Sequence, residues 1–333
     1  MAPEQAEVPT GIPNTDLFTI EAIPSKGKGL VASKAIPAGT LLISEPPLFT
    51  TASLTNAETI EKDLGAIVRA LPREGQKAFL FLHNNFPGQP NPFSNIIRSN
   101  GYPLGPNSEV GGIFPLIARM NHSCRPNAQH AWNEKLGRQT VYAVRDVAAG
   151  EELTLSYHNG GPSSERRAAL KQFFGFDCAC ELCALPPKQL RESDRRLRDA
   201  AKLDASIGDA RRVRLAPADA LKDCKELLRV YEAEGVRDTR LPRLYYDAFQ
   251  ICAMHADAAR ASVFAENARR VRELSEGPDS DEAAAMRALE ENPESFENWG
   301  STKQWLSKVS DRETRYKDIE CPVTVKMASI WNA

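Results

Sequence analysis

Three cysteines form the densest cluster of reactive side chains in this sequence. Cys178, Cys180 and Cys183 follow a Cys-x-Cys-x-x-Cys pattern, and the rest of the seven cysteines are scattered. Thiolate sulfur is a preferred ligand of zinc, which takes four ligands in tetrahedral geometry at about 2.3 Å from sulfur. The cluster predicts a zinc site that needs a fourth ligand, or else three free thiols in a reducing compartment. The candidates for that ligand are Cys124, His122, His158, Cys224, Cys252 and Cys321.

A second polar segment, Asn121-His122-Ser123-Cys124, offers further metal or ligand contacts. Alone it carries little weight, because a histidine is more often a hydrogen-bonded structural residue than a ligand. The segment Lys26-Gly27-Lys28-Gly29 has the composition of an exposed hairpin turn. Tyr157 ends a predicted strand, where it fits either a buried tyrosine or a catalytic hydroxyl.

Short strands and helices must position these residues. Strands are predicted where β-forming residues alternate or cluster, at 17–23, 29–35, 40–46, 128–133, 139–147 and 151–157. Helical spacing predicts helices at 54–81, 93–99, 113–120 and 163–173, the last capped by Ser163 or Ser164. The later part is rich in alanine, leucine, arginine and glutamate, and predicts helices at 190–207, 217–234, 241–255, 258–276 and 281–291. Such helix pairs resemble a tetratricopeptide-like array, without a clean repeat consensus.

Composition and charge limit the class of protein. Of 333 residues, 42% are hydrophobic and 26% charged, with a formal net charge of −2, the balance of a soluble globular protein. Nucleic-acid binding usually needs a basic face, so this charge argues against it. We expect no membrane span and no secretory signal in residues 1–10. The odd, clustered cysteines indicate a reducing compartment, the nucleus or the cytoplasm.

Four segments, in this order and spacing, resemble the SET-domain methyltransferases, most closely the SET and MYND domain family. They are 26–30 (KGKGL), 119–127 (RMNHSCRPN), 150–157 (GEELTLSY) and 176–183 (FDCACELC). The resemblance covers about residues 17–185, and the helical region beyond resembles that family's C-terminal domain less specifically. Residues 47–120 contain no cysteine and one histidine, so the family's MYND zinc finger is missing.

The resemblance implies a site for S-adenosylmethionine, with S-adenosylhomocysteine as the product. Its cofactor-binding residues would be Lys26, Gly27, Lys28, Gly29, Asn100, Asn121, His122, Tyr157 and Phe176. Tyr157 would be the catalytic residue, whose hydroxyl orients the attacking amine and the methyl group. The resemblance also makes Cys124 the fourth ligand of one structural zinc ion (Zn2+), beside Cys178, Cys180 and Cys183.

The implied reaction is methyl transfer to the side-chain amine of lysine. That amine has a reference pKa of ~10.4 and must lose its proton first, which an apolar channel beside a sulfonium cation favours.

Two positions depart from the family pattern. Phe174 replaces a tyrosine that many relatives have, and Leu155 replaces a residue that is often aromatic. The role of a second hydroxyl and the number of methyl groups added are therefore open.

The resemblance implies the fold class α+β, with small sheets and a pseudoknot, in which the chain threads beneath another segment. Residues 1–16 would be a flexible tail, and 17–162 a SET domain with a helical insertion near 54–110. A post-SET zinc-binding segment at 163–186 and a tetratricopeptide-like helical domain at 187–333 would follow.

Two other functions are open from the sequence. The SET portion could be an inactive scaffold, with the helical region serving as a protein-interaction module, and such a protein would bind cofactor without turnover. A zinc-stabilised nucleic-acid binder would instead show salt-sensitive DNA affinity. We expect a protein or peptide lysine substrate, histone or non-histone, and a monomer that binds neither membrane nor nucleic acid.

Overall fold

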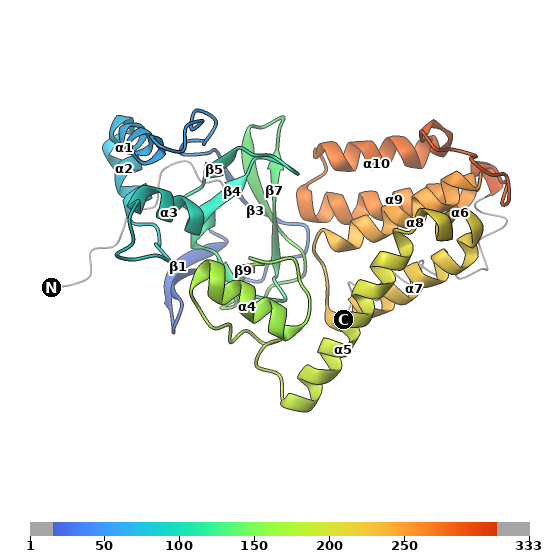
Figure 1. Cartoon of the computed structure of the whole chain (residues 1–333), viewed down its shortest axis with the longest axis horizontal. Helices are drawn as coiled ribbons and strands as arrows, with labels where there is room; N and C mark the ends of the chain where they lie inside the picture. Colours follow the sequence, from blue (N-terminus) through green and yellow to red (C-terminus); the bar gives the residue numbers. More distant parts are fainter. Residues whose placement is uncertain (1–15, 312–333) are drawn as a thin grey trace.

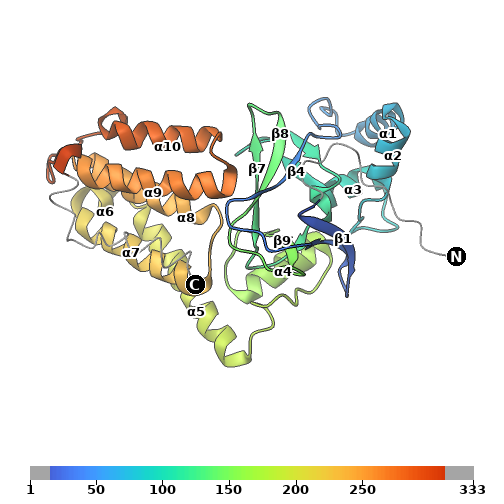
Figure 2. The ribbon, with the colours of Figure 1, turned by 180° about the vertical axis from the view of Figure 1, so that it is seen from behind.

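The computed structural model describes residues 16–311 of the chain. Figures 1 and 2 show small β-sheets in the middle, short helices on one side and a stack of longer helices on the other. Residues 1–15 of the predicted tail and the zinc candidate Cys321 lie outside the described residues. Within the described part of the chain, no helix is both long enough and apolar enough to cross a membrane.

The first sheet has four strands in the order β1–β2–β9–β6. β1 (Phe18–Ile23) and β2 (Gly27–Ala32) form an antiparallel hairpin, and Gly27 supplies the positive φ of its turn. β9 (Glu152–Leu155) pairs antiparallel with β2 and parallel with the two-residue strand β6 (Asn121–His122). Parallel strands need a long connection, so residues far apart in sequence meet in this sheet.

The connection between β6 and β9 supplies part of a second sheet, of order β3–β8–β7. β3 (Leu41–Glu45), β8 (Arg138–Ala143) and β7 (Ala128–Asn133) pair antiparallel. A separate antiparallel pair consists of β4 (Gly101–Pro103) and β5 (Gly111–Ile113). One apolar core joins the first two sheets, and its buried members include Leu30, Leu42, Phe114, Val141 and Leu153.

Three short helices occupy the predicted insertion: α1 (Ile60–Ala70), α2 (Arg73–Leu80) and α3 (Pro92–Asn100). The single helical pattern predicted over 54–81 is divided at Pro72, because proline lacks the N–H that would continue a helix. The group has a small core of its own, in which Phe79 is fully buried.

The prediction of a helix over 113–120 is wrong. β5 ends at Ile113, and only a short 3-10 helix, η1 (Ile117–Arg119), follows. The apolar side chains here are almost all buried, including Phe114 and Met120. A short apolar run that is buried on all sides does not reveal its period, so strand and helix cannot be told apart from the pattern.

Beyond the sheets the chain is mainly helical. The helices are α4 (Ser163–Phe174), α5 (Pro187–Ile207), α6 (Ala210–Leu215), α7 (Pro217–Glu234), α8 (Arg240–Met254), α9 (Ala258–Glu276) and α10 (Asp281–Glu291). The sequence pattern does not predict α6, a short helix capped by the side chain of Asp209. Successive helices from α7 to α10 pack against one another, and α5 to α10 contribute to a shared apolar core.

The helical region packs against the sheets through α9, which contacts β7 and β8, and through polar contacts. Ser163, one of two predicted helix caps, makes no cap hydrogen bond and instead donates its hydroxyl to Asp194 of α5 at 2.7 Å. Arg125, which directly follows Cys124, pairs with the buried Glu234 at 3.4 Å. The helices are thus tied to the segments that carry the candidate site.

Candidate functional site

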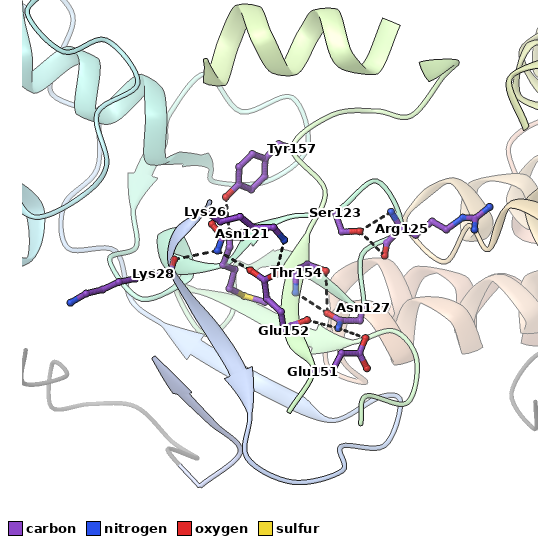
Figure 3. Close-up of polar contacts among 11 residues, drawn as sticks. Lys26, Lys28, Asn121, Ser123, Arg125, Asn127, Glu151, Glu152, Thr154 and Tyr157 are labelled. Atoms are coloured by element: carbon purple, nitrogen blue, oxygen red, sulfur yellow. Dashed lines mark hydrogen bonds and ion pairs between the residues drawn. The ribbon is translucent and has the colours of Figure 1, made fainter. Parts of the chain in front are cut away.

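The parallel pair β6–β9 brings together two of the sequence motifs. Asn121 pairs with Thr154 and His122 with Leu155, and Tyr157 follows just beyond the end of β9. Figure 3 shows the phenol of Tyr157 directed toward this strand pair, where its hydroxyl donates to the backbone carbonyl of Met120, the residue before Asn121. The pairing therefore gathers three of the predicted site residues, Asn121, His122 and Tyr157.

Asn127, which is not among the predicted site residues, holds this strand pair in place (Figure 3). Its Oδ1 accepts a hydrogen bond from the backbone N–H of Thr154 at 2.8 Å, and its Nδ2 donates to the backbone carbonyl of Glu152 at 2.8 Å. Asn127 is 1% exposed, so water does not compete for these bonds. The motif RMNHSCRPN contains this asparagine, but its partner strand is visible only in the fold.

The glycine-rich turn lies beside Asn121 (Figure 3). Nδ2 of Asn121 donates to the backbone carbonyl of Lys28 at 3.3 Å and to Oε1 of Glu152 at 2.8 Å. Lys26 forms an ion pair of 2.6 Å with the same glutamate, whereas the side chain of Lys28 points away. A Cβ on Gly29 would lie 2.7 Å from Nδ2 of Asn121. Glycine at this position therefore permits the close contact between β2 and Asn121.

Tyr157 is held at its backbone and at its hydroxyl. Its backbone N–H donates to Nδ1 of His122 at 3.1 Å, and its phenol donates to the backbone carbonyl of Met120 at 2.6 Å. The ring centroids of Phe174 and Phe176 lie 4.8 Å and 6.5 Å from its own. Burial raises the pKa of Tyr157 well above its usual range, so the phenol stays protonated at neutral pH.

Three other predicted cofactor residues have different surroundings. Phe176 is half-buried, and its ring centroid is 6.0 Å from that of His122, so an aromatic face borders the site. Gly27 lies in the hairpin turn, and a Cβ there would meet no atom within 4 Å. Asn100 ends α3, where its amide donates to a carbonyl of that helix and to one of the preceding loop, each at 2.7 Å. The amide hydrogens of Asn100 are therefore used in local structure.

Four cysteines, Cys124, Cys178, Cys180 and Cys183, have their sulfur atoms within 4.8 Å of one another. The Sγ atom of Cys124 is 4.0 Å from that of Cys178 and 3.7 Å from that of Cys183. Two sulfurs at ~2.3 Å from one tetrahedral zinc would be about 3.8 Å apart. The four side chains are buried together, so their number, chemistry and spacing fit a zinc ion.

The remaining candidates for a fourth ligand are placed differently. Cys224 and Cys252 lie in the apolar core of the helical region, apart from the cluster. His122 and His158 lie next to Cys124, with their Nε2 atoms 3.3 Å and 3.2 Å from its sulfur. The structure thus brings Cys124 to the clustered cysteines and adds two histidines around it.

The environment of the sulfurs is polar despite its burial. Burial lowers the pKa of His122 to about 3 and that of His158 to about 4, and nearby charges add to the effect, so both rings are neutral at neutral pH. The guanidinium of Arg166, a residue only 1% exposed, is 3.7 Å from the sulfur of Cys183. A buried cation beside thiols favours their thiolate form.

Glu45 supports the segment that leads into Asn121. Its carboxylate accepts hydrogen bonds from the backbone N–H groups of Leu116 and Ile117, each at 3.0 Å. Burial raises the pKa of Glu45 to about 7, although these two hydrogen bonds oppose the rise. The sequence offers no signal for this role, because the partners lie more than 70 residues away in the chain.

Replacing Glu45 with glutamine is expected to change how stability depends on pH. A carboxyl whose pKa is raised by folding stabilises the fold below its unfolded pKa, near ~4.3, and this stability is lost as pH rises through about 7. The free energy of unfolding of the wild type, relative to Glu45→Gln, should therefore fall by on the order of 2 kcal/mol between pH 5 and 8. Urea denaturation at four pH values measures this, and a constant difference would contradict the raised pKa.

Comparison with known proteins agrees with the geometry of the site. Residues 27–158 match the SET domain family model. The histone-lysine N-methyltransferase set5 of Schizosaccharomyces pombe is 35% identical over 283 residues, which cover 84% of this chain and 86% of that protein. The chain therefore belongs to the family of SET-domain lysine methyltransferases.

Matches to SET and MYND domain proteins are shorter. The histone-lysine N-methyltransferase SMYD3 of Homo sapiens is 40% identical over 82 residues, 24% of this chain and 19% of that protein. Human SMYD1, named likewise, is 28% identical over 175 residues, 47% of this chain and 32% of that protein. The matches thus span less than a third of the length of either human relative. Together with the match to set5, they confirm the predicted family resemblance.

Proposed function

We propose that this chain transfers the methyl group of S-adenosylmethionine to the side-chain amine of a lysine in a protein substrate. The observation that carries the proposal is the β6–β9 pair, which sets Tyr157 beside Asn121 and His122. Membership of the SET-domain family supports the same chemistry. The bound cofactor would supply a methyl group on a sulfonium sulfur and leave as S-adenosylhomocysteine.

The proposed cofactor site consists of Lys26, Gly27, Lys28, Gly29, Asn100, Asn121, His122, Tyr157 and Phe176. Backbone groups of β6 and the face of Phe176 would hold the adenine, and the cationic turn would meet the carboxylate. Lys26 already forms an ion pair with Glu152, so its ammonium group would be shared between the carboxylate of Glu152 and that of the cofactor. Asn100 would offer its side-chain oxygen to a ligand, since its amide hydrogens are engaged.

Tyr157 would position the substrate amine rather than remove its proton. Its hydroxyl donates to Met120, so the oxygen lone pairs are left to accept a hydrogen bond from the amine. Because burial raises its pKa, the phenol is not ionised and is a poor base. An apolar channel would favour the neutral lysine amine, and alignment of that amine with the methyl group would provide most of the rate.

One structural zinc ion, held by Cys124, Cys178, Cys180 and Cys183, is the second part of the proposal. The distances between their sulfurs fit tetrahedral coordination, and four protein ligands leave no open position for catalysis. Cys124 follows β6 closely, and the other three ligands follow α4. Zinc would therefore hold the post-SET segment, residues 163–186, against the strand that carries the cofactor residues.

The proposed domain division is SET domain 17–162, post-SET segment 163–186 and helical domain 187–333. Packing of successive helices supports a tetratricopeptide-like array, and the parallel pairing of β6 with β9 supports the pseudoknot. The substrate would be a lysine of a histone, as the names of the relatives suggest, or of another protein. Location in the nucleus or cytoplasm, a monomeric state and the lack of nucleic-acid binding stay predictions.

The inactive-scaffold alternative finds no support in the comparisons, because the matched relatives are named as methyltransferases. Turnover nevertheless needs a direct measurement. Methyl transfer from S-adenosylmethionine to histones and to other lysine-containing proteins, followed by mass spectrometry, would identify the modified residue. Cofactor binding with no transfer to any such substrate would favour the scaffold over the enzyme.

Calorimetric titration of the zinc-loaded full chain with S-adenosylhomocysteine tests the cofactor site. We expect saturable binding at one site per chain. Phe176→Ala should weaken it by about tenfold, because a stacked aromatic face contributes roughly 1–3 kcal/mol. Phe173→Ala, which removes a side chain that is 52% exposed on the same segment, serves as the matched control and should bind normally. Absence of binding at millimolar ligand by folded wild type would refute the proposed function.

A further inference from the structure

Two histidine rings contact the sulfur of Cys124 in the same way. Nε2 of His122 lies 3.3 Å from it, and Nε2 of His158 lies 3.2 Å from it. The opposite ring nitrogen, Nδ1, accepts a backbone hydrogen bond in both cases. The donor is the N–H of Tyr157 for His122, at 3.1 Å, and the N–H of Gly160 for His158, at 2.8 Å.

These backbone contacts decide which ring nitrogen carries the proton. A nitrogen that accepts a hydrogen bond has no proton of its own, so each ring carries its proton on Nε2. Nε2 then has no lone pair to offer a metal, and it donates an N–H to the sulfur of Cys124. The group His122, Cys124 and His158 is therefore better described as one sulfur with two donors than as a second metal site.

The two rings connect this sulfur to the backbone around Tyr157. His122 holds the start of the segment 157–160 and His158 holds its end. The phenol of Tyr157 is fixed separately, by the carbonyl of Met120. Each imidazole contacts the sulfur of Cys124 directly through Nε2 and a backbone N–H directly through Nδ1, so a shift of the sulfur would move both Nδ1 acceptors.

We infer that His158, together with His122, is a positioning residue that couples the zinc site to Tyr157. The inference rests on the proposed zinc site. Metal binding would fix the sulfur of Cys124, and hydrogen bonds to that sulfur would fix the two imidazole rings. The rings in turn would fix the backbone of residues 157–160. Outer groups that hydrogen-bond to metal ligands orient those ligands and tune the metal, and here the same bonds would also orient the catalytic tyrosine.

The test uses His158, because His122 is also a proposed cofactor residue. His158→Leu removes both hydrogen bonds, whereas His158→Gln offers an N–H donor and a carbonyl acceptor that can restore them. His158→Phe keeps a ring and lacks both nitrogens, and it replaces the leucine variant if that protein does not fold. The matched control is His83→Leu, the same change at an exposed histidine.

The first measurement is the absorption of the cobalt(II)-substituted full chain. An N–H donor stabilises the sulfur lone pairs, so its loss should shift the sulfur-to-cobalt charge-transfer band to longer wavelength. We expect this shift in His158→Leu with one cobalt still bound per chain, a smaller shift in His158→Gln and none in His83→Leu. An unshifted band in His158→Leu would overturn the inference, and so would loss of the metal, which would make His158 a ligand.

The second measurement is hydrogen exchange at the backbone N–H of Tyr157 in the zinc-loaded proteins. Its acceptor, His122, is unchanged in these variants, so faster exchange reports a displaced backbone. We expect about a tenfold increase in His158→Leu and near-normal exchange in His158→Gln, with Leu153 in β9 unaffected. Unchanged exchange at Tyr157 would overturn the coupling.

These two readouts need no catalysis, so they separate the inference from the proposed function. If both measurements give the expected differences between the variants, but the metal-loaded wild type methylates no lysine, the methyltransferase function is refuted and the coupling stands. A folded wild type that binds neither zinc nor cobalt would refute the zinc site and this inference together.

Discussion

Replacing Tyr157 with phenylalanine is expected to reduce lysine methylation by roughly 100-fold, with little change in the affinity for S-adenosylhomocysteine. The phenylalanine ring keeps the contacts with Phe174 and Phe176, whose centroids lie 4.8 Å and 6.5 Å away. Only the hydroxyl is removed, and with it the hydrogen bond to Met120. The variant therefore loses the group that aligns the amine and keeps the surface that holds the cofactor.

Single-turnover methylation and calorimetry on the same preparations would measure the two effects. Tyr246→Phe is the matched control, because Tyr246 lies on α8 in the helical region and stacks on Phe249 at 5.7 Å. It should methylate and bind as the wild type does. Near-normal turnover of Tyr157→Phe would refute the catalytic role, and an equal loss of cofactor binding would assign Tyr157 to binding alone.

The residues of the candidate site could be predicted from the sequence because they lie in short motifs that follow one another in a fixed order. The KGKG turn and the NHSC segment are unspecific when taken singly, and it is the order and spacing of these segments with the cysteine cluster that indicates the family. The strand patterns placed β2 and β9 in outline, with predictions at 29–35 and 151–157, whereas the two-residue strand β6 was not predicted. The pairing that unites them, β6 parallel to β9, required the family resemblance, because no local pattern encodes a contact between distant residues.

Other features depend on tertiary contacts that a single sequence does not show. The buried run at 113–120 carries no period, so its β5 strand and short 3-10 helix were missed. Asn127 and Glu45 read as ordinary polar residues, and their importance arises from backbone groups supplied by distant segments. The sequence indicated His158 only as a candidate zinc ligand. Its contact with Gly160, which shows that Nε2 carries the proton, exists only in the folded chain.

Replacing Cys124 with serine is expected to release the zinc and destabilise the SET portion. A serine hydroxyl is a weak zinc ligand at neutral pH, so three thiolates would be left to hold the ion. Structural zinc contributes directly to folding free energy, and we expect a loss on the order of 3 kcal/mol or more. The same substitution removes the acceptor of the N–H donors from His122 and His158, so methylation should fall more than stability alone predicts.

Cys224→Ser provides the matched control for this loss. Cys224 is fully buried in the core of the helical region, so serine there also places a hydroxyl in an apolar site, at a cost of roughly 1–3 kcal/mol. The two variants should thus both unfold at lower temperature, but only Cys124→Ser should lose metal. Zinc per chain, measured by mass spectrometry after gel filtration, separates them. Full retention of zinc by Cys124→Ser would exclude Cys124 as a ligand, and equal loss from Cys224→Ser would mean that zinc responds to stability in general rather than to this sulfur.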